Sequence, residues 1–217
     1  MSNLQDLRKI LSSIGPNSCP EKINLHCHTL FSDGSLSPES LIYQACQRNL
    51  NHLSITDHHT VKAYNAIYRW LDLNQSCYRK VPKIWSGIEI SCLLKNCLVH
   101  VIGLGFDLSN KALFPYTRGE SPNGKYLEAP NVVKAIREAG GLIVLAHPAR
   151  YRLPYFELIA EAARLGFDGG EAWYDYEHST PWKPTPLVCE SINNQLKSLN
   201  LLTTCGTDSH GYDLSCR

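Results

Sequence analysis

Residues 23–34 read INLHCHTLFSDG, an apolar run that contains a His-x-His pair and ends in Asp-Gly. Side chains two residues apart in an extended strand point the same way, so His26 and His28 are predicted to project together. Two imidazoles on one strand face, about 6–7 Å apart at the backbone, can converge on one divalent cation. The pair alone is a weak signal, so its meaning depends on what the rest of the chain places beside it.

Apolar strands alternate with amphipathic helices along the chain. Strands are predicted at 23–28, 52–59, 84–90, 99–105, 142–147, 167–173 and 201–206. Helices are predicted between them at 37–49, 61–78, 131–139, 154–165 and 186–199. Ser37 is expected to cap the first of these helices, with Pro38 in its first turn. This alternation is typical of a parallel α/β architecture, with a hairpin at 94–97 as the exception.

Histidines and carboxylates recur at the C-terminal ends of the predicted strands. They are His26, His28, Asp33, His58, Glu89, His100, His147, Asp208 and His210. In a (β/α) barrel these strand ends form one rim, where active sites lie, whereas an open sheet gathers ligands near one crevice. The recurrence at strand after strand therefore predicts a barrel, with this set of residues on its rim.

The chemistry of the set suits borderline divalent cations. Mixed imidazole and carboxylate ligands are usual for zinc, manganese and iron. Glu89 can bridge two cations because a carboxylate offers two oxygens. Metals about 3.5–4 Å apart hold a hydroxide between them and clamp a phosphoryl oxygen. The sequence therefore points to a multinuclear metal site.

The composition is that of one ordinary globular domain. With 217 residues and 43% hydrophobic content, the chain suits a single sizeable core. A formal net charge of +1 excludes a broad basic surface, so any phosphate recognition must be local. The nine cysteines include no Cys-x-x-Cys pair, so reduced and mostly buried thiols in a cytoplasmic protein are expected.

Residues 1–21 are predicted to form a helical extension ahead of the main domain. Apolar residues repeat at helical spacing from Leu4 to Ile14, before the Gly-Pro break at 15–16. Charged residues interrupt any signal-peptide core, and no stretch approaches the roughly 20 apolar residues of a membrane span. We expect this helix to cover the bottom of the domain and the protein to act away from membranes.

The chain resembles the PHP (polymerase and histidinol phosphatase) family in several motifs that occur in the family's order. These are His26-x-His28, Thr56-Asp57-His58, Gly87-Ile88-Glu89, His100, Ala146-His147-Pro148 and Gly206-x-Asp208-Ser209-His210. The resemblance extends over residues 22–213. It implies a distorted seven-stranded TIM-like (β/α) barrel as a single domain over residues 22–217, with a cluster of three divalent metal ions (Mn, Zn or Fe).

The family's ligand sets can be carried over residue by residue. The resemblance implies that His26, His28, Glu89 and Asp208 hold the first metal and that Glu89, His100 and His147 hold the second. The third would be held by Asp33, His58 and His210.

The resemblance implies a metal-dependent phosphoesterase that hydrolyses a phosphomonoester by attack of a metal-bridging hydroxide. Similar stand-alone members act on nucleoside 3′,5′-bisphosphates and on 5′-phosphorylated oligonucleotides, so a nucleotide or a short oligonucleotide is the expected partner. Arg150 and His210 are the predicted catalytic residues, because Arg150 follows the His147 motif directly and can fork onto a phosphate. Glu171, at another strand end, is predicted to orient a ligand or Arg150.

Two other functions stay open at this stage. One is a metal-dependent amidohydrolase, although no lysine lies at a strand end to serve as a modified bridging ligand. The other is a non-catalytic metal-binding module that recognises a phosphorylated partner, although the ligand set is complete. Many relatives also carry an inserted helical subdomain where this chain has only a loop near 107–130, and residues 109–129 are a hypothetical lid.

Overall fold

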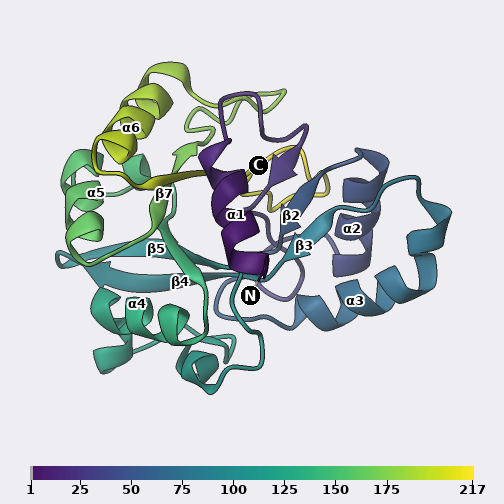
Figure 1. The fold of residues 1–217 in the computed structure, drawn as a ribbon, viewed down its shortest axis with the longest axis horizontal. Coiled ribbons are helices and arrows are strands. Elements are labelled where there is room, and N and C mark those ends of the chain that lie inside the picture. The colour runs from purple at the N-terminus through teal and green to yellow at the C-terminus, as the bar shows by residue number, and fades with distance from the viewer. Residues whose placement is uncertain (1) are drawn as a thin grey trace.

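The computed structural model contains two hydrogen-bonded sheets with helices around them (Figure 1). It describes the backbone from residue 2 and the side chains from residue 4. The smaller sheet has the order β1-β2-β3, and the larger has the order β4-β5-β6-β7-β8. The strands are β1 Ile23–Asn24, β2 His52–Ser54, β3 Lys83–Trp85, β4 Gly87–Leu94, β5 Cys97–Leu104, β6 Leu142–Leu145, β7 Gly169–Trp173 and β8 Leu202–Cys205. All pairs are parallel except β4–β5 and β5–β6, so the expected parallel α/β core and the hairpin are both present.

The predicted helices are all present, with ends that shift by a few residues. They are α1 Ser2–Ser12, α2 Pro38–Gln47, α3 Ala63–Asn74, α4 Ala129–Glu138, α5 Tyr155–Arg164 and α6 Pro186–Ser198. Ser37 caps α2 as predicted, since its side chain accepts a hydrogen bond from the Ser40 amide at 3.1 Å. Short 3₁₀ helices lie at η1 Gln75–Cys77, η2 Lys111–Tyr116, η3 Gly124–Leu127 and η4 Pro148–Arg150. The long loop at 109–129 is therefore largely two 3₁₀ turns.

One predicted strand is two strands, which corrects the expected count of seven. The chain leaves the smaller sheet at Trp85 and enters the larger sheet at Gly87, so 84–90 is split between β3 and β4. A Cβ at Gly87 would overlap the Ser54 hydroxyl and lie 2.7 Å from the carbonyl oxygen of Ile55. The crossing therefore needs glycine for close backbone approach. Within residues 2–217 the strands form no closed sheet, and the seven-stranded TIM-like barrel is not shown.

The two sheets meet through isolated bridges rather than a continuous ladder. Cys27 pairs with Ser209, and His58 pairs with Glu89, each in a parallel bridge. Figure 1 shows α2 and α3 beside the smaller sheet and α4, α5 and α6 around the larger one. One buried apolar cluster joins the larger sheet to Ile23 of β1 and Trp85 of β3, and a second contains Leu53 of β2 with residues of α2 and α3. The polar residues of the predicted rim lie where the two sheets adjoin.

Helix α1 packs into the core of the larger sheet, in agreement with the expected cover over the bottom of the domain. Leu7 and Leu11 are fully buried, and Leu7 lies against Gly105 just after β5. Arg8 pairs with Asp168, just before β7. Whether residues 1–21 form a separate extension stays a prediction.

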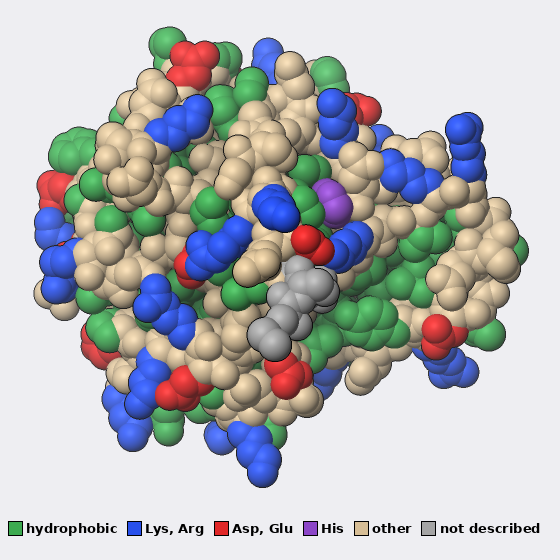
Figure 2. All heavy atoms as spheres, in the orientation of Figure 1, with side chains coloured by type: hydrophobic (Ala, Val, Ile, Leu, Met, Phe, Trp, Pro, Cys, Tyr) green, Lys and Arg blue, Asp and Glu red, His purple; other side chains and the backbone are tan. Residues whose placement is uncertain are grey.

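The remaining composition-based expectations can be checked on the described chain. All nine cysteines are free thiols, and seven of them are buried. Within residues 2–217, no helix has the length and apolar character that crossing a bilayer requires. Figure 2 shows basic and acidic side chains dispersed over the face it presents, in keeping with the net charge of +1.

Candidate metal centre

The His-x-His pair lies just beyond β1, where the chain bridges the two sheets. The His28 amide donates to the carbonyl of Ser209 at 3.1 Å, and the carbonyl of His26 accepts from the Asp208 amide at 2.8 Å. Cys27 between them faces the other core, as expected from strand alternation. Both imidazoles are buried and point to the same side, toward Glu89 and Asp208.

Four buried side chains form the first group of donor atoms. The Nε2 atoms of His26 and His28 each lie 3.1 Å from Glu89 Oε2 and from Asp208 Oδ1. The Nε2 atom of His28 is buried without a hydrogen-bond partner, although these two oxygens are so near. Ligands about 2.0–2.2 Å from one cation stand about 3 Å apart, so these donors fit a divalent metal better than a hydrogen-bonded cluster.

The second group gathers around the other oxygen of Glu89. His100 Nδ1 lies 3.0 Å from Glu89 Oε1, and His147 Nε2 lies 3.2 Å from the same atom. His58 joins Glu89 and His100 within ligating range, although the family's pattern places it with the third metal. In contrast to the prediction, Glu89 and His100 lie within β4 and β5 and not at C-terminal strand ends.

The third group lies at the solvent-exposed edge of the centre. Asp33 Oδ2 lies 3.2 Å from His210 Nε2 and 3.7 Å from His58 Nε2, and His28 belongs to this group as well. The Asp33 side chain is 54% exposed, whereas the first group is fully enclosed. The structure thus brings all the predicted ligands together, and their role as ligands stays a prediction.

The buried carboxylates and imidazoles of the centre shift one another's pKa values. Burial alone would raise the pKa of the Glu89 carboxyl, but His26, His100 and His147 outweigh it and hold this pKa well below its usual range. Burial likewise opposes a charged His28, yet the carboxylates of Asp208 and Glu89, each 3.1 Å from its Nε2 atom, raise its pKa to about 9. Without a metal, protons on His26 and His28 therefore offset the charge of the buried carboxylates, whereas burial lowers the pKa of His147 and favours its neutral form.

A second layer of buried groups fixes which ring nitrogen faces the centre. Glu171 Oε1 lies 3.1 Å from His26 Nδ1, and Glu171 Oε2 accepts from the His147 amide at 2.9 Å. The Tyr151 hydroxyl lies 3.1 Å from His147 Nδ1. These contacts leave the Nε2 atoms of both histidines for Glu89, which is the usual arrangement around metal-bound imidazoles. Glu171 therefore contacts two of the predicted ligands, and that it orients metal ligands stays a prediction.

Two of the predicted ligands, His147 and Asp208, lie in turns with positive backbone φ angles. His147 has φ 26° and Asp208 has φ 53°, conformations that are costly for residues with a side chain. In each case the unusual turn directly follows a strand of the larger sheet, β6 or β8. Such strain at the ends of strands is typical of functional sites.

Asp208 Oδ2 faces a cluster of cations and hydroxyls on the solvent side. Arg150 Nη1 lies 3.2 Å from it, Arg217 Nε donates to it at 3.1 Å, and the Tyr174 hydroxyl donates at 2.7 Å. The Arg150 side chain remains 40% exposed, so a ligand at the centre can reach its guanidinium. Sequence reasoning named Arg150 but did not predict the contacts of Tyr174 and Arg217 with Asp208, because no motif marks them.

Hydrogen bonds to Asp57 hold the loop that contains Asp33. This buried carboxylate accepts from the amide and the hydroxyl of Thr29, both at 2.6 Å, and from the Ser32 hydroxyl at 2.9 Å. Asp57 was identified only as part of the Thr-Asp-His motif. Its role is to hold the 29–34 turn in place beside His58.

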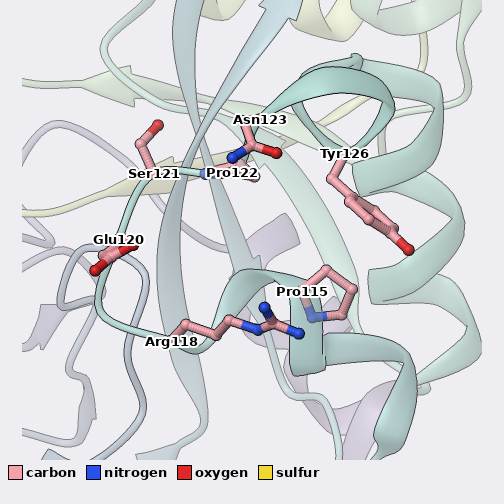
Figure 3. A pocket seen from close by; sticks show the side chains of 7 residues that line it. All are labelled: Pro115, Arg118, Glu120, Ser121, Pro122, Asn123 and Tyr126. Carbon is pink, nitrogen blue, oxygen red and sulfur yellow. The ribbon is translucent and has the colours of Figure 1, made fainter.

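The 109–129 segment borders the centre at one point. The Gly119 amide donates to the carbonyl of His59 at 2.8 Å, next to His58. Figure 3 shows the small pocket of about 160 Å³ that this segment forms, with Arg118 beside Pro115 and Tyr126 on the opposite wall. None of the predicted metal ligands lines this pocket.

The chain is similar in sequence to known enzymes over part of its length. The chain is 34% identical over 90 residues to the 5′-3′ exoribonuclease Rnm of Salmonella typhimurium, covering 42% of this chain and 29% of that protein. It is 31% identical over 91 residues to a 3′,5′-nucleoside bisphosphate phosphatase of Chromobacterium violaceum, covering 42% and 30%. The aligned part therefore spans about a third of the length of these curated relatives.

The fold also has solved counterparts. The crystal structure of a proposed metal-dependent phosphoesterase from Bifidobacterium adolescentis matches with a TM-score of 0.68 at 23% identity, covering 89% of both chains. At this identity the match supports the fold alone. The model of the PHP domain matches residues 24–159, which contain seven of the nine predicted ligands. The chain therefore belongs to the PHP domain family.

Proposed function

We propose that this chain is a metal-dependent phosphoesterase that uses three divalent metals, Mn, Zn or Fe, to hydrolyse a phosphorylated nucleotide or the 5′ end of a short oligonucleotide. One observation carries the proposal: both oxygens of the buried Glu89 are shared among imidazoles, Oε2 with His26 and His28 and Oε1 with His100 and His147. This arrangement is suited to a bridging carboxylate in a multinuclear site.

The side chains that would hold the metals are those of the three groups described above. When bound, divalent cations lower the pKa of a coordinated water and neutralise charge that develops on phosphoryl oxygens. The protein's part is to supply neutral imidazole nitrogens at fixed positions. Glu171 and Tyr151 do this for His26 and His147 by engaging their Nδ1 atoms.

Arg150 is proposed to bind the phosphate. Its guanidinium is half-exposed, borders Asp208 at the centre and keeps donors free for a ligand. Burial alone would lower the pKa of the Arg150 guanidinium, but Tyr174 and Asp208 outweigh it and raise this pKa. The Arg150 side chain therefore stays positively charged at neutral pH. Arg217, on the other side of Tyr174, adds a second positive charge to the same edge.

His210 is proposed to act beside the third group. Its Nδ1 lies 2.8 Å from the carbonyl oxygen of Asp208, which fixes the proton on that nitrogen. Its Nε2 is then directed at Asp33 and the exposed edge, where it can contact a cation or a substrate oxygen. This exposed edge is where a leaving group would depart.

The first test is release of inorganic phosphate from a nucleoside 3′,5′-bisphosphate in the presence of manganese. We expect release by the wild type and a near-complete loss, of about 100-fold or more, in His147→Ala, because Glu89 loses one of its partners. His52→Ala is the matched control, since His52 lies at the start of β2 outside the three groups.

The result separates the functions left open by the sequence. Phosphate release that depends on His147 establishes the phosphoesterase. Metal binding without hydrolysis of any phosphoester would instead identify a non-catalytic module. Hydrolysis of amides but not of phosphoesters would identify an amidohydrolase. Equal release by wild type and His147→Ala would show that the activity does not come from this centre.

A further inference from the structure

We propose that the cleft between the 29–34 turn and helix α3 binds the second nucleotide of a single-stranded oligonucleotide whose 5′ end lies at the metal centre. This inference rests on the proposed function and narrows its substrate class to oligonucleotides. The cleft has a volume of about 430 Å³ and is lined by Phe31, Glu39, Lys62, Asn65, Ala66 and Arg69. That volume falls in the range of roughly 300–1,000 Å³ typical of small-molecule sites.

One wall of the cleft is a single face of α3 and its N-cap. Lys62, Asn65, Ala66 and Arg69 follow the spacing i, i+3, i+4, i+7, which places them in one stripe along a helix. Within the described side chains, from residue 4 to 217, neither Lys62 nor Arg69 has a carboxylate partner within ion-pair distance. Two exposed cations about two turns apart are therefore available to phosphates.

The opposite wall presents an aromatic ring. Phe31 is 43% exposed, and the turn that contains it is held by hydrogen bonds. The Phe31 amide donates to the Thr29 hydroxyl at 3.2 Å, which in turn donates to the buried Asp57 at 2.6 Å. A rigid, exposed ring beside cations is the combination that binds single-stranded nucleic acids, since every base has a face that stacks on an aromatic side chain.

Each wall of the cleft contains a residue that is close in sequence to a proposed metal ligand. Phe31 precedes Asp33 by two residues, and Lys62 follows His58 by four. Even a fully extended chain spans no more than about 14 Å over four residues, so Phe31 and Lys62 lie within that distance of Asp33 and His58 in the third group. A strand with its terminal phosphate at that group would thus place its next nucleotide between Phe31 and α3. Glu39, the one carboxylate on the wall, can accept hydrogen bonds from base amino groups.

Binding by the manganese-loaded protein tests the inference independently of hydrolysis. The probes are 3′-fluorescent oligonucleotides of one to four nucleotides with a 5′-thiophosphate and phosphorothioate linkages, which slow hydrolysis at both kinds of ester, measured by fluorescence anisotropy. We expect wild-type affinity to rise from one to two nucleotides. Phe31→Ala should weaken dinucleotide binding about tenfold, and Phe31→Tyr should restore it. Lys62→Ala/Arg69→Ala should reduce the slope of log affinity against log salt by about 0.7 for each phosphate that the variant no longer neutralises.

The matched control is Phe156→Ala/Lys134→Ala, which removes an exposed ring and an exposed cation from α5 and α4. The inference would be overturned if both Phe31→Ala and Lys62→Ala/Arg69→Ala kept the wild-type rise in affinity from one to two nucleotides. It would also be overturned if the control variant lowered this rise as much as the cleft variants do. Length-dependent binding without any hydrolysis would leave the cleft intact and overturn the proposed function, so the two failures are distinguishable.

Discussion

At the scale of single residues, Glu89 links the whole centre. Its two oxygens lie in different groups, so removing it would leave four imidazoles without their shared partner. The motifs could predict these ligands because histidine and carboxylate positions are visible in the sequence. Tyr174 and Arg217 could not be predicted, because their contacts with Asp208 depend on how β7 and the C-terminal segment pack beside β8.

Substitution of Glu171 tests whether the groups that contact His26 and His147 affect metal binding. The substitution Glu171→Gln places an amide next to His26 Nδ1 and the His147 amide, so one of the two acceptor oxygens is replaced by a donor. We expect metal affinity to fall about 10- to 100-fold, as for other groups that orient metal-bound histidines. The measurement is competitive titration of the metal against a chelator of known affinity.

The matched control for Glu171→Gln is Glu161→Gln on α5. Glu161 pairs with Arg164 at the surface and is remote from the histidines. Its substitution should leave metal affinity unchanged. Equal affinity in wild type and Glu171→Gln would show that the histidines are oriented without this carboxylate.

At the scale of elements, the crossing from β3 to β4 decides where Glu89 lies. The substitution Gly87→Ala would place a Cβ against the Ser54 hydroxyl and the Ile55 carbonyl. We expect a loss of about 1–3 kcal/mol in the free energy of unfolding, typical of overpacked sites, as measured by urea denaturation of the metal-free protein. Gly15→Ala is the control, because a Cβ at Gly15 meets nothing within 4 Å. Equal stabilities of the two variants would contradict the role of this crossing.

This crossing also shows where sequence reasoning ends. The helices were predicted within a few residues because apolar spacing and caps such as Ser37 are local signals. The break at Ser86 was missed because apolar residues flank Ser86 and Gly87 on both sides, and only the tertiary pairing assigns the two halves to different sheets. Closure of the strands into a barrel likewise depends on long-range pairing that periodicity does not specify.

At the scale of the whole molecule, protons and metals compete for the same buried nitrogens. His28 has its pKa raised to about 9 in the folded, metal-free protein, against an ordinary value near 6.5 in the unfolded chain. A raised histidine pKa stabilises the fold fully below pH 6.5, and this stabilisation is lost as the pH rises through 9. A bound metal needs the neutral imidazole, so its contribution instead persists as the pH rises.

We therefore expect the stability of metal-free and manganese-loaded protein to diverge between about pH 6.5 and 9. The thermal midpoint of the metal-free protein should fall across this interval, while that of the loaded protein should fall less. Measured by differential scanning calorimetry at saturating manganese and in excess chelator, the difference should be larger at pH 9 than at pH 6.5. A constant difference would mean that His28 is already neutral in the metal-free protein, because only a proton that the metal displaces makes the two curves separate with pH.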